Sequence, residues 1–152
     1  MTLRFASLAS GSKGNCLVAE AGDTCVMLDC GLVPREAERR LARLGLAPAD
    51  IGAVLVTHEH DDHAGHAFAF AALHRVPLYF THGTRAALEE TRRANRGAEM
   101  HVIDGRSEFA VDGLTLRPFT VPHDAREPAQ FVISDGAHRL GVLPDLGAST
   151  AH

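Results

Sequence analysis

Residues 57–63 read T-H-E-H-D-D-H and carry the side chains in this sequence that are best suited to chemistry. They place three histidines and several carboxylates within seven positions, directly after the apolar run 51–56. Imidazoles and carboxylates bind divalent metal ions, whereas three imidazoles this close together repel one another when protonated and have no evident structural use. We therefore predict a metal site at the C-terminal end of a strand; the alternative is a polar turn whose histidines are merely exposed.

The spacing inside this motif indicates two metal positions. His58 and His60 lie two residues apart at a strand end, so their side chains leave on the same side and can share one ion. Asp62 and His63 follow where the chain turns into a helix, and they can point at a neighbouring position. Two ions about 3.5–4 Å apart can share a hydroxide and stabilise both the attacking and the leaving oxygen of an ester.

Two later residues are candidates for the remaining ligands. His123 follows an expected strand in the segment V-P-H-D, and Asp145 holds the same position in L-P-D-L-G. Either residue alone would more often be an ordinary loop residue. Together with the 57–63 cluster they become candidate ligands, because an imidazole can complete one site and a carboxylate can bridge two ions with its two oxygens.

Four ordered motifs resemble the metallo-β-lactamase fold superfamily: L-D-C-G at 28–31, H-x-H-x-D-H at 58–63, His123, and D-L-G at 145–147. Within that superfamily, S-G-S-K-G-N at 10–15 and P-H-D-A at 122–125 resemble the YycJ/WalJ-type branch, whose members are regarded as DNA exonucleases. The resemblance implies a hydrolase that uses a metal-bound hydroxide and acts on DNA or another phosphodiester. It also implies two divalent ions as cofactors, zinc or manganese, with iron as a further candidate.

The same resemblance, carried over position by position, assigns the site residues. The first metal would be held by His58, His60 and His123, and the second by Asp62 and His63. Asp145 would bridge the two metals. Asp29 would orient the ligands, and Asp62 and Asp29 are the candidate catalytic carboxylates. Glu59 and Asp61 fall at variable positions of the motif, and Asp61 is predicted to be the N-cap of the helix that follows.

The elements that must position these residues alternate between strands and helices. Strands are predicted at 3–9, 16–20, 24–28, 51–56, 77–80, 100–103, 108–111, 114–121, 130–134 and 139–143, and helices at 34–44, 64–73 and 82–95. Hairpin-like spacing at both ends and a β–α–β–α–β order in the middle predict one α/β domain over residues 1–152. The resemblance implies a metallo-β-lactamase-type αββα sandwich, represented largely by its N-terminal half and part of the second sheet.

The family pattern continues past the bridging aspartate with a helix, further strands and a final histidine for the second metal. Only seven residues follow Asp145 here. We therefore expect a C-terminally incomplete domain in which the second metal lacks a ligand and one face of the sandwich is uncovered. A homo-oligomer could cover that face.

Composition limits the class of protein. Hydrophobic residues at 45% and charged residues at 22% describe an ordinary globular domain, and no apolar run is long enough to span a bilayer. Because no signal peptide is recognisable, and because three cysteines (Cys16, Cys25 and Cys30) form no CxxC pair, a reduced, cytoplasmic location is expected. The net charge of −4 argues against a strongly basic nucleic-acid surface, although 14 of the 15 basic residues are arginines that cluster on two expected helices.

Three functions remain open from the sequence. The first is a two-metal phosphodiesterase, most simply a DNA exonuclease. The second keeps the fold but changes the bond, to a thioester or lactam hydrolase of the glyoxalase II or β-lactamase kind. The third is a metal-binding fragment that is catalytically silent because the C-terminal half is absent.

Overall fold

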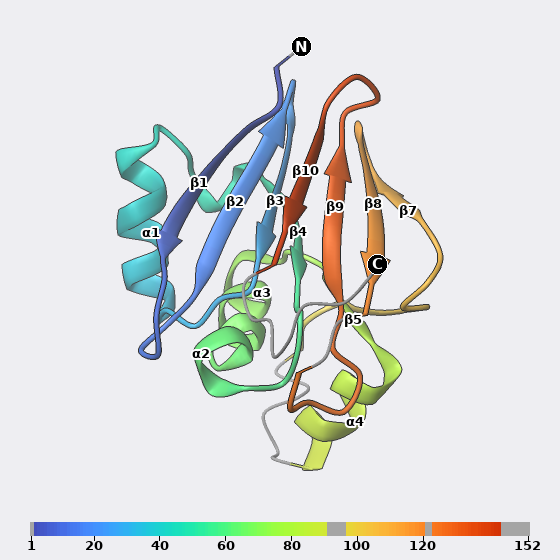
Figure 1. Cartoon of the computed structure of the whole chain (residues 1–152). Helices are drawn as coiled ribbons and strands as arrows, with labels where there is room; N and C mark the ends of the chain where they lie inside the picture. Colours follow the sequence, from blue (N-terminus) through green and yellow to red (C-terminus); the bar gives the residue numbers. More distant parts are fainter. Residues whose placement is uncertain (1, 91–96, 121–122, 144–152) are drawn as a thin grey trace.

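The computed structural model describes residues 2–90, 97–120 and 123–143, and these form two β-sheets with helices (Figure 1). The first sheet has six strands in the order β1-β2-β3-β4-β5-β6, and the second has four in the order β10-β9-β8-β7. The strands of the first sheet are β1 (Arg4–Ala9), β2 (Cys16–Ala21), β3 (Thr24–Leu28), β4 (Ile51–Leu55), β5 (Leu78–Thr81) and β6 (Met100–Ile103). Those of the second are β7 (Phe109–Val111), β8 (Leu114–Phe119), β9 (Gln130–Ser134) and β10 (Arg139–Val142). The helices are α1 (Pro34–Arg43), α2 (Asp61–Ala64), α3 (Ala67–His74) and α4 (His82–Glu90), with a 3₁₀ turn η1 at Pro48–Asp50.

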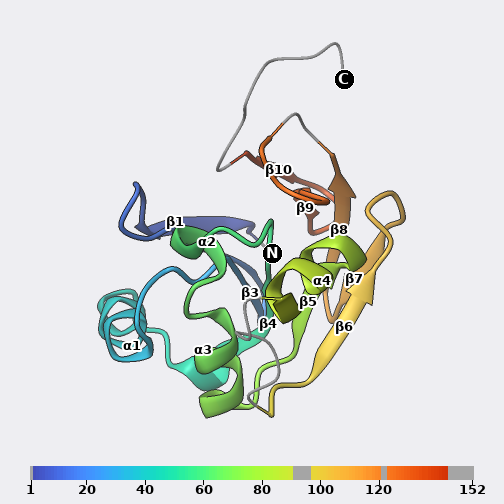
Figure 2. The same ribbon diagram turned by 90° about the horizontal axis from the view of Figure 1, so that it is seen from below.

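The sheets and helices pack as three layers, with the six-stranded sheet in the middle (Figure 2). Strand β3 shows why: all five of its residues are buried, and they alternate between two cores. Met27 packs with Leu41 of α1 on the helix side, whereas Val26 and Leu28 pack with Phe131 of β9 between the sheets. A strand that is apolar on both faces must be covered on both faces, which places it at the centre of the layers.

This arrangement confirms the α/β class and the mixed sheet order predicted from the sequence. Strands β1, β2 and β3 pair antiparallel, and the pairs β3–β4, β4–β5 and β5–β6 are parallel. In the part of the chain that the structure describes, no helix covers the outer face of the four-stranded sheet. Within the same ranges, no helix is both long and apolar enough to cross a membrane.

Parallel strands β3, β4 and β5 end at the same edge of the sheet, and the chemically important segments follow them there. Asp29 comes directly after β3, with a left-handed φ of 58° that turns the chain away from the strand direction. Its backbone N–H still donates to the carbonyl oxygen of Leu55 at the end of β4, at 2.8 Å. The carboxyl ends of such strands are where α/β proteins usually bind ligands.

Two predictions about the segment after the histidine motif are wrong in detail. The single helix expected over 64–73 is divided into α2 and α3, because the N–H of His66 donates to the carbonyl oxygen of Cys30 at 2.9 Å instead of continuing the helix. Asp61 is not the N-cap of α2; His60 holds that position, and Asp61 is the first helical residue. The predicted helix 82–95 is described only to Glu90, since residues 91–96 lie outside the described ranges.

Candidate metal centre

Three imidazoles from two separate segments meet at the carboxyl edge of the six-stranded sheet. His58 and His60 follow β4, whereas His123 lies between β8 and β9. One ligand nitrogen from each ring lies within 4.8 Å of the other two, and the ring centroids are 4.4–4.9 Å apart. The fold therefore gathers the three histidines predicted for the first metal from positions more than sixty residues apart in the chain.

Burial keeps the central ring of this cluster neutral. His58 is fully buried, whereas His60 and His123 are half-buried. Burial, together with the nearby rings of His63, His123 and His60, lowers the pKa of His58 to about 3. At neutral pH this side chain is an uncharged imidazole, the form that can bind a metal.

The Asp29 side chain contacts the buried His63 directly and the buried His58 through Thr57. This carboxylate is 1% exposed, and its Oδ1 accepts the N–H of Thr57 at 2.7 Å. Its Oδ2 accepts the Thr57 hydroxyl at 2.7 Å and lies 2.7 Å from Nδ1 of His63. The Thr57 hydroxyl oxygen in turn lies 2.9 Å from Nδ1 of His58.

These contacts determine which ring nitrogens carry protons. A carboxylate only accepts, so the Nδ1–H of His63 must donate to Asp29, and the O–H of Thr57 must donate there as well. With its proton directed to Asp29, the Thr57 oxygen accepts from His58, which places the His58 proton on Nδ1. In its neutral form each of the two rings therefore presents an unprotonated Nε2, the atom that a metal would use.

A second convergence of donor atoms lies beside the first. Oδ2 of Asp62 is 3.5 Å from Nε2 of His63, the spacing of two atoms that can share one ion. The side-chain amide of Asn15 lies 3.1 Å from the former atom and 3.3 Å from the latter. Asn15 thus reaches the two residues predicted for the second metal from the loop between β1 and β2.

Close backbone contacts fix this second group. The N–H of Asn15 donates to the carbonyl oxygen of Asp62 at 2.7 Å, and the N–H of Gly31 donates to the carbonyl oxygen of Asn15 at 3.0 Å. The N–H of Cys30 donates to the carbonyl oxygen of His63 at 2.8 Å. A Cβ on Gly31 would lie 2.1 Å from the Asp62 carbonyl oxygen, so only glycine allows these segments to approach so closely.

A hollow of about 330 Å³ between β1 and β10 borders the centre. Its lining includes Asn15 and Asp29 of the centre and the apolar side chains of Phe5, Leu140 and Leu143. Phe5 and Leu143 are 61% and 51% exposed, so the hollow has solvent-exposed apolar side chains on both its β1 side and its β10 side.

The donor atoms suit a divalent ion. Zinc takes imidazole nitrogen and carboxylate oxygen at about 2.0–2.2 Å in a tetrahedral arrangement, which separates its ligand atoms by about 3.4 Å. The Asp62–His63 pair already has nearly this spacing at 3.5 Å, and the ligand atoms of the three-histidine cluster, which lie within 4.8 Å of one another, need to approach by at most about 1.4 Å. Manganese and iron accept the same mixture of nitrogen and oxygen ligands.

Sequence reasoning missed three residues that organise this centre: Asn15, Thr57 and Glu59. The 10–15 loop was singled out from the sequence as a motif of the family resemblance, which gave no role to Asn15, whereas the structure shows that the Asn15 side chain makes the contacts. Thr57 precedes the motif, and Glu59 lies at a position taken as variable. The remaining predicted ligand, Asp145, lies outside the described residues.

The family profile described as the metallo-beta-lactamase superfamily matches residues 9–149. The chain belongs to this superfamily. Its two-sheet core and the histidine motif at the carboxyl edge of the parallel strands agree with that membership.

Curated relatives are similar to the chain over 70–97% of its length. The exodeoxyribonuclease YycJ of Bacillus anthracis is 30% identical over 148 residues, which make up 97% of this chain and 56% of that protein. The exodeoxyribonuclease WalJ of Streptococcus pneumoniae (strain D39) is 27% identical over 146 residues, 95% of this chain and 54% of that protein. A ribonuclease of Thermus thermophilus is 37% identical over 108 residues, 70% of this chain and 22% of that protein. The chain therefore spans about half the length of the two exodeoxyribonucleases.

Solved structures share the fold. The Rm3 metallo-beta-lactamase superposes with a TM-score of 0.71 at 17% identity, covering 90% of this chain and 56% of that one. BJP-1, a subclass B3 metallo-beta-lactamase of Bradyrhizobium japonicum, gives a TM-score of 0.65 at 18% identity, covering 84% and 53%. At such low identity these likenesses establish the fold alone.

Proposed function

We propose that this protein is a metal-dependent phosphodiesterase that degrades DNA from an end. The observation that carries the proposal is the pairing of two donor groups at one sheet edge: the histidine cluster and the Asp62–His63 pair. The names of the two relatives that match nearly the whole chain support DNA as the substrate. Because the chain spans about half of those relatives, the activity is proposed for the whole protein.

In this proposal the first ion is held by His58, His60 and His123, and the second by Asp62 and His63. Asp145 is proposed as the carboxylate shared between them. A bound pair of divalent ions would supply a hydroxide at neutral pH and would neutralise the negative charge of the phosphodiester during its hydrolysis.

The described residues prepare the centre for this chemistry. Asp29 acts as a positioning residue, since it touches Thr57 and His63 and directs their donors. Its effect is to keep the proton of the neutral His58 and His63 rings on Nδ1, so that Nε2 of each neutral ring is the nitrogen presented to an ion. The low pKa of His58, about 3, keeps that ring available at any pH at which nucleases are commonly assayed.

End-labelled single- and double-stranded DNA tests the proposal directly. The protein is stripped with a chelator and reloaded with zinc or manganese, and the parent is compared with Asp62→Asn, which keeps the size of the side chain but removes its charge. We expect the labelled strand to shorten from one end in the parent and far less in the variant. Equal activity in the two proteins, or none in either with any of these metals, would refute the assignment.

Three further substrates separate the alternatives. RNA of the same sequence is included because one relative is named a ribonuclease. A thioester and a chromogenic cephalosporin are included because they report the bonds that related hydrolases could cut. Turnover of either of these two, without cleavage of nucleic acid, would replace the phosphodiesterase proposal. Metal binding without any turnover would instead support a catalytically silent domain.

A further inference from the structure

Glu59 sits between two of the proposed ligands, and its side chain makes a contact that the metal motif does not require. Its Oε1 accepts the backbone N–H of Arg126 at 2.9 Å. Arg126 follows His123 by three residues, so this bond joins the segment that carries His58 and His60 to the loop that carries His123.

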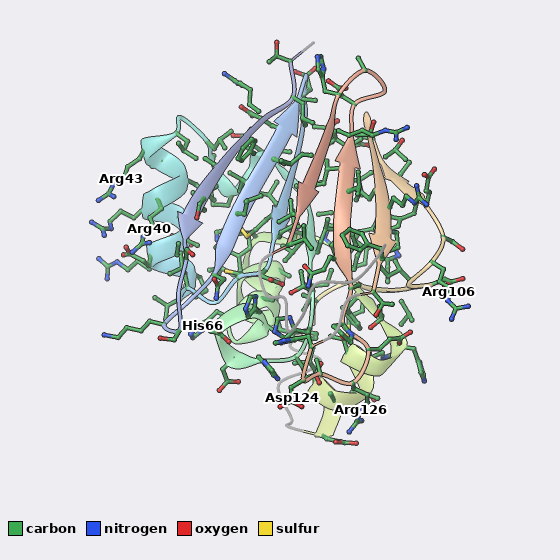
Figure 3. All side chains as sticks on the ribbon, in the orientation of Figure 1. Arg40, Arg43, His66, Arg106, Asp124 and Arg126 are labelled. Atoms are coloured by element: carbon green, nitrogen blue, oxygen red, sulfur yellow. The ribbon has the colours of Figure 1, made fainter. Side chains whose placement is uncertain are left out.

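The far side of the same loop is held by α4 and β5. The Arg126 guanidinium donates to both carboxylate oxygens of Glu90, at 2.8 and 2.9 Å. Glu127 accepts the N–H of Gly83 at 2.7 Å through Oε1, and its carbonyl oxygen accepts the Thr81 hydroxyl at 2.7 Å. In Figure 3 the labelled side chains of Asp124 and Arg126 lie at the end of the molecule occupied by α2 and α4. The loop is thus fixed to α4 on one side, and Glu59 supplies a contact on the metal side.

The second oxygen of Glu59 shows that this residue is not placed for stability alone. Oε2 is shut away from solvent and has no hydrogen-bond partner among the described residues. A buried carboxylate oxygen without a partner costs free energy, and an apolar residue of the same size would avoid that cost. Each such unsatisfied group in a folded protein calls for an explanation, and a functional role is one of them.

We infer that Glu59 is a positioning residue that holds the His123 loop against the other two histidines. Its carboxylate fixes the distance between the two segments that must supply ligands to one ion, while Arg126 and Glu90 keep the loop from turning away. The inference rests on the metal site named in the proposed function, but it concerns an additional residue.

The test compares Glu59→Met with Glu59→Gln. Methionine keeps the length of the side chain and removes the acceptor, whereas glutamine keeps an amide oxygen that can accept the Arg126 N–H. Glu108→Ala, at an exposed position on the outer face of the four-stranded sheet, is the control for loss of a carboxylate. Zinc affinity is measured by competition with a chromophoric chelator. We expect about a 10- to 100-fold loss for Glu59→Met, as for other residues that support metal ligands, about threefold or less for Glu59→Gln, and none for the control.

A second readout needs no metal. Hydrogen exchange of the Arg126 amide, followed by NMR in the chelator-treated protein, should be slow in the parent and in Glu59→Gln and at least about tenfold faster in Glu59→Met. Should Glu59→Met fail to fold by circular dichroism, Glu59→Ala replaces it.

Zinc affinity and amide exchange that are unchanged in Glu59→Met would overturn the inference, as would losses in Glu59→Gln as large as those in Glu59→Met. A parent protein that binds no zinc would refute the proposed metal site. In that case, amide exchange that depends on Glu59 would uphold the loop contact, and exchange that does not would overturn it.

Discussion

An Asp29→Asn substitution should reverse the proton positions on two imidazoles without removing either ring. In the parent, the Asp29 carboxylate accepts from Thr57 and from Nδ1 of His63, all at 2.7 Å. Asparagine keeps one oxygen for the Thr57 N–H but places an NH₂ group where Oδ2 was. That group donates to Nδ1 of His63, which must then give up its proton and carry it on Nε2.

The same reversal is passed on through Thr57. With an amide donating to its oxygen, the Thr57 hydroxyl turns its proton toward Nδ1 of His58, 2.9 Å away. His58 then also carries its proton on Nε2, so one ligand of each proposed ion is in the wrong tautomer. Losing a supporting carboxylate typically costs about 10- to 100-fold in metal affinity, and two affected ligands place the expected loss at the upper end, about 100-fold.

Two measurements check this expectation. Zinc affinity is determined by chelator competition, and the ¹⁵N shifts of the ring nitrogens, recorded without metal, identify which nitrogen is protonated. Asp112→Asn is the matched control: Asp112 is exposed at the β7–β8 turn, and its φ of 47° is close to the 58° of Asp29, a conformation that asparagine tolerates well. The reasoning is refuted if Asp29→Asn keeps the parent tautomers, or if its zinc affinity equals that of the control.

Three further predictions address the surroundings of the centre. Gly31→Ala should lower the free energy of unfolding, measured in urea, by about 3 kcal/mol, because its Cβ would lie 2.1 Å from a backbone oxygen of α2. Gly141→Ala is the control: a Cβ there meets nothing within 4 Å, so the free energy of unfolding should change by less than about 0.5 kcal/mol. Equal effects of the two substitutions would contradict the close approach at Gly31. Thr57→Val should weaken zinc binding by about tenfold, because it removes the hydroxyl that sets the tautomer of His58. Thr115→Val, at an exposed position, should leave zinc binding unchanged. A Thr57→Val variant that binds zinc as tightly as the parent would contradict this role of the hydroxyl. His58 stays neutral in the folded protein down to a pKa of about 3, but its usual value in the unfolded chain is about 6.5, so stability should fall as pH drops from about 6.5 toward 3. In chelator-treated protein, His58→Gln should make this slope shallower by up to one proton, about 1.4 kcal/mol per pH unit, and an unchanged slope would contradict the low pKa.

The strands and the order of elements were predictable because their signals are local. Strand β3 was predicted at its observed bounds, and β4 within one residue, since apolar runs bounded by turns mark them in the sequence. The break between α2 and α3 was not predictable. It depends on the bond from His66 to Cys30, and the near-continuous small and apolar residues of 64–73 carry no sign of it.

The metal centre also has parts that were predictable from the sequence and parts that were not. The spacing of the histidine motif predicted that His58 and His60 would face one position. His123 was a candidate ligand from its place after an expected strand, and the resemblance assigned it to the same ion. The structure brings all three together. The roles of Asn15 and Glu59 could not be predicted from the sequence, because each acts on a segment more than forty residues away. Contacts of that kind follow from the packing of the sheets and loops.

The most direct test of this account is an X-ray structure of the protein crystallised with zinc, with anomalous scattering used to locate the metal. We predict an anomalous peak about 2.0–2.1 Å from Nε2 of His58 and within bonding distance of the rings of His60 and His123. Zinc bound elsewhere, or these three rings without an ion at saturating zinc, would contradict it.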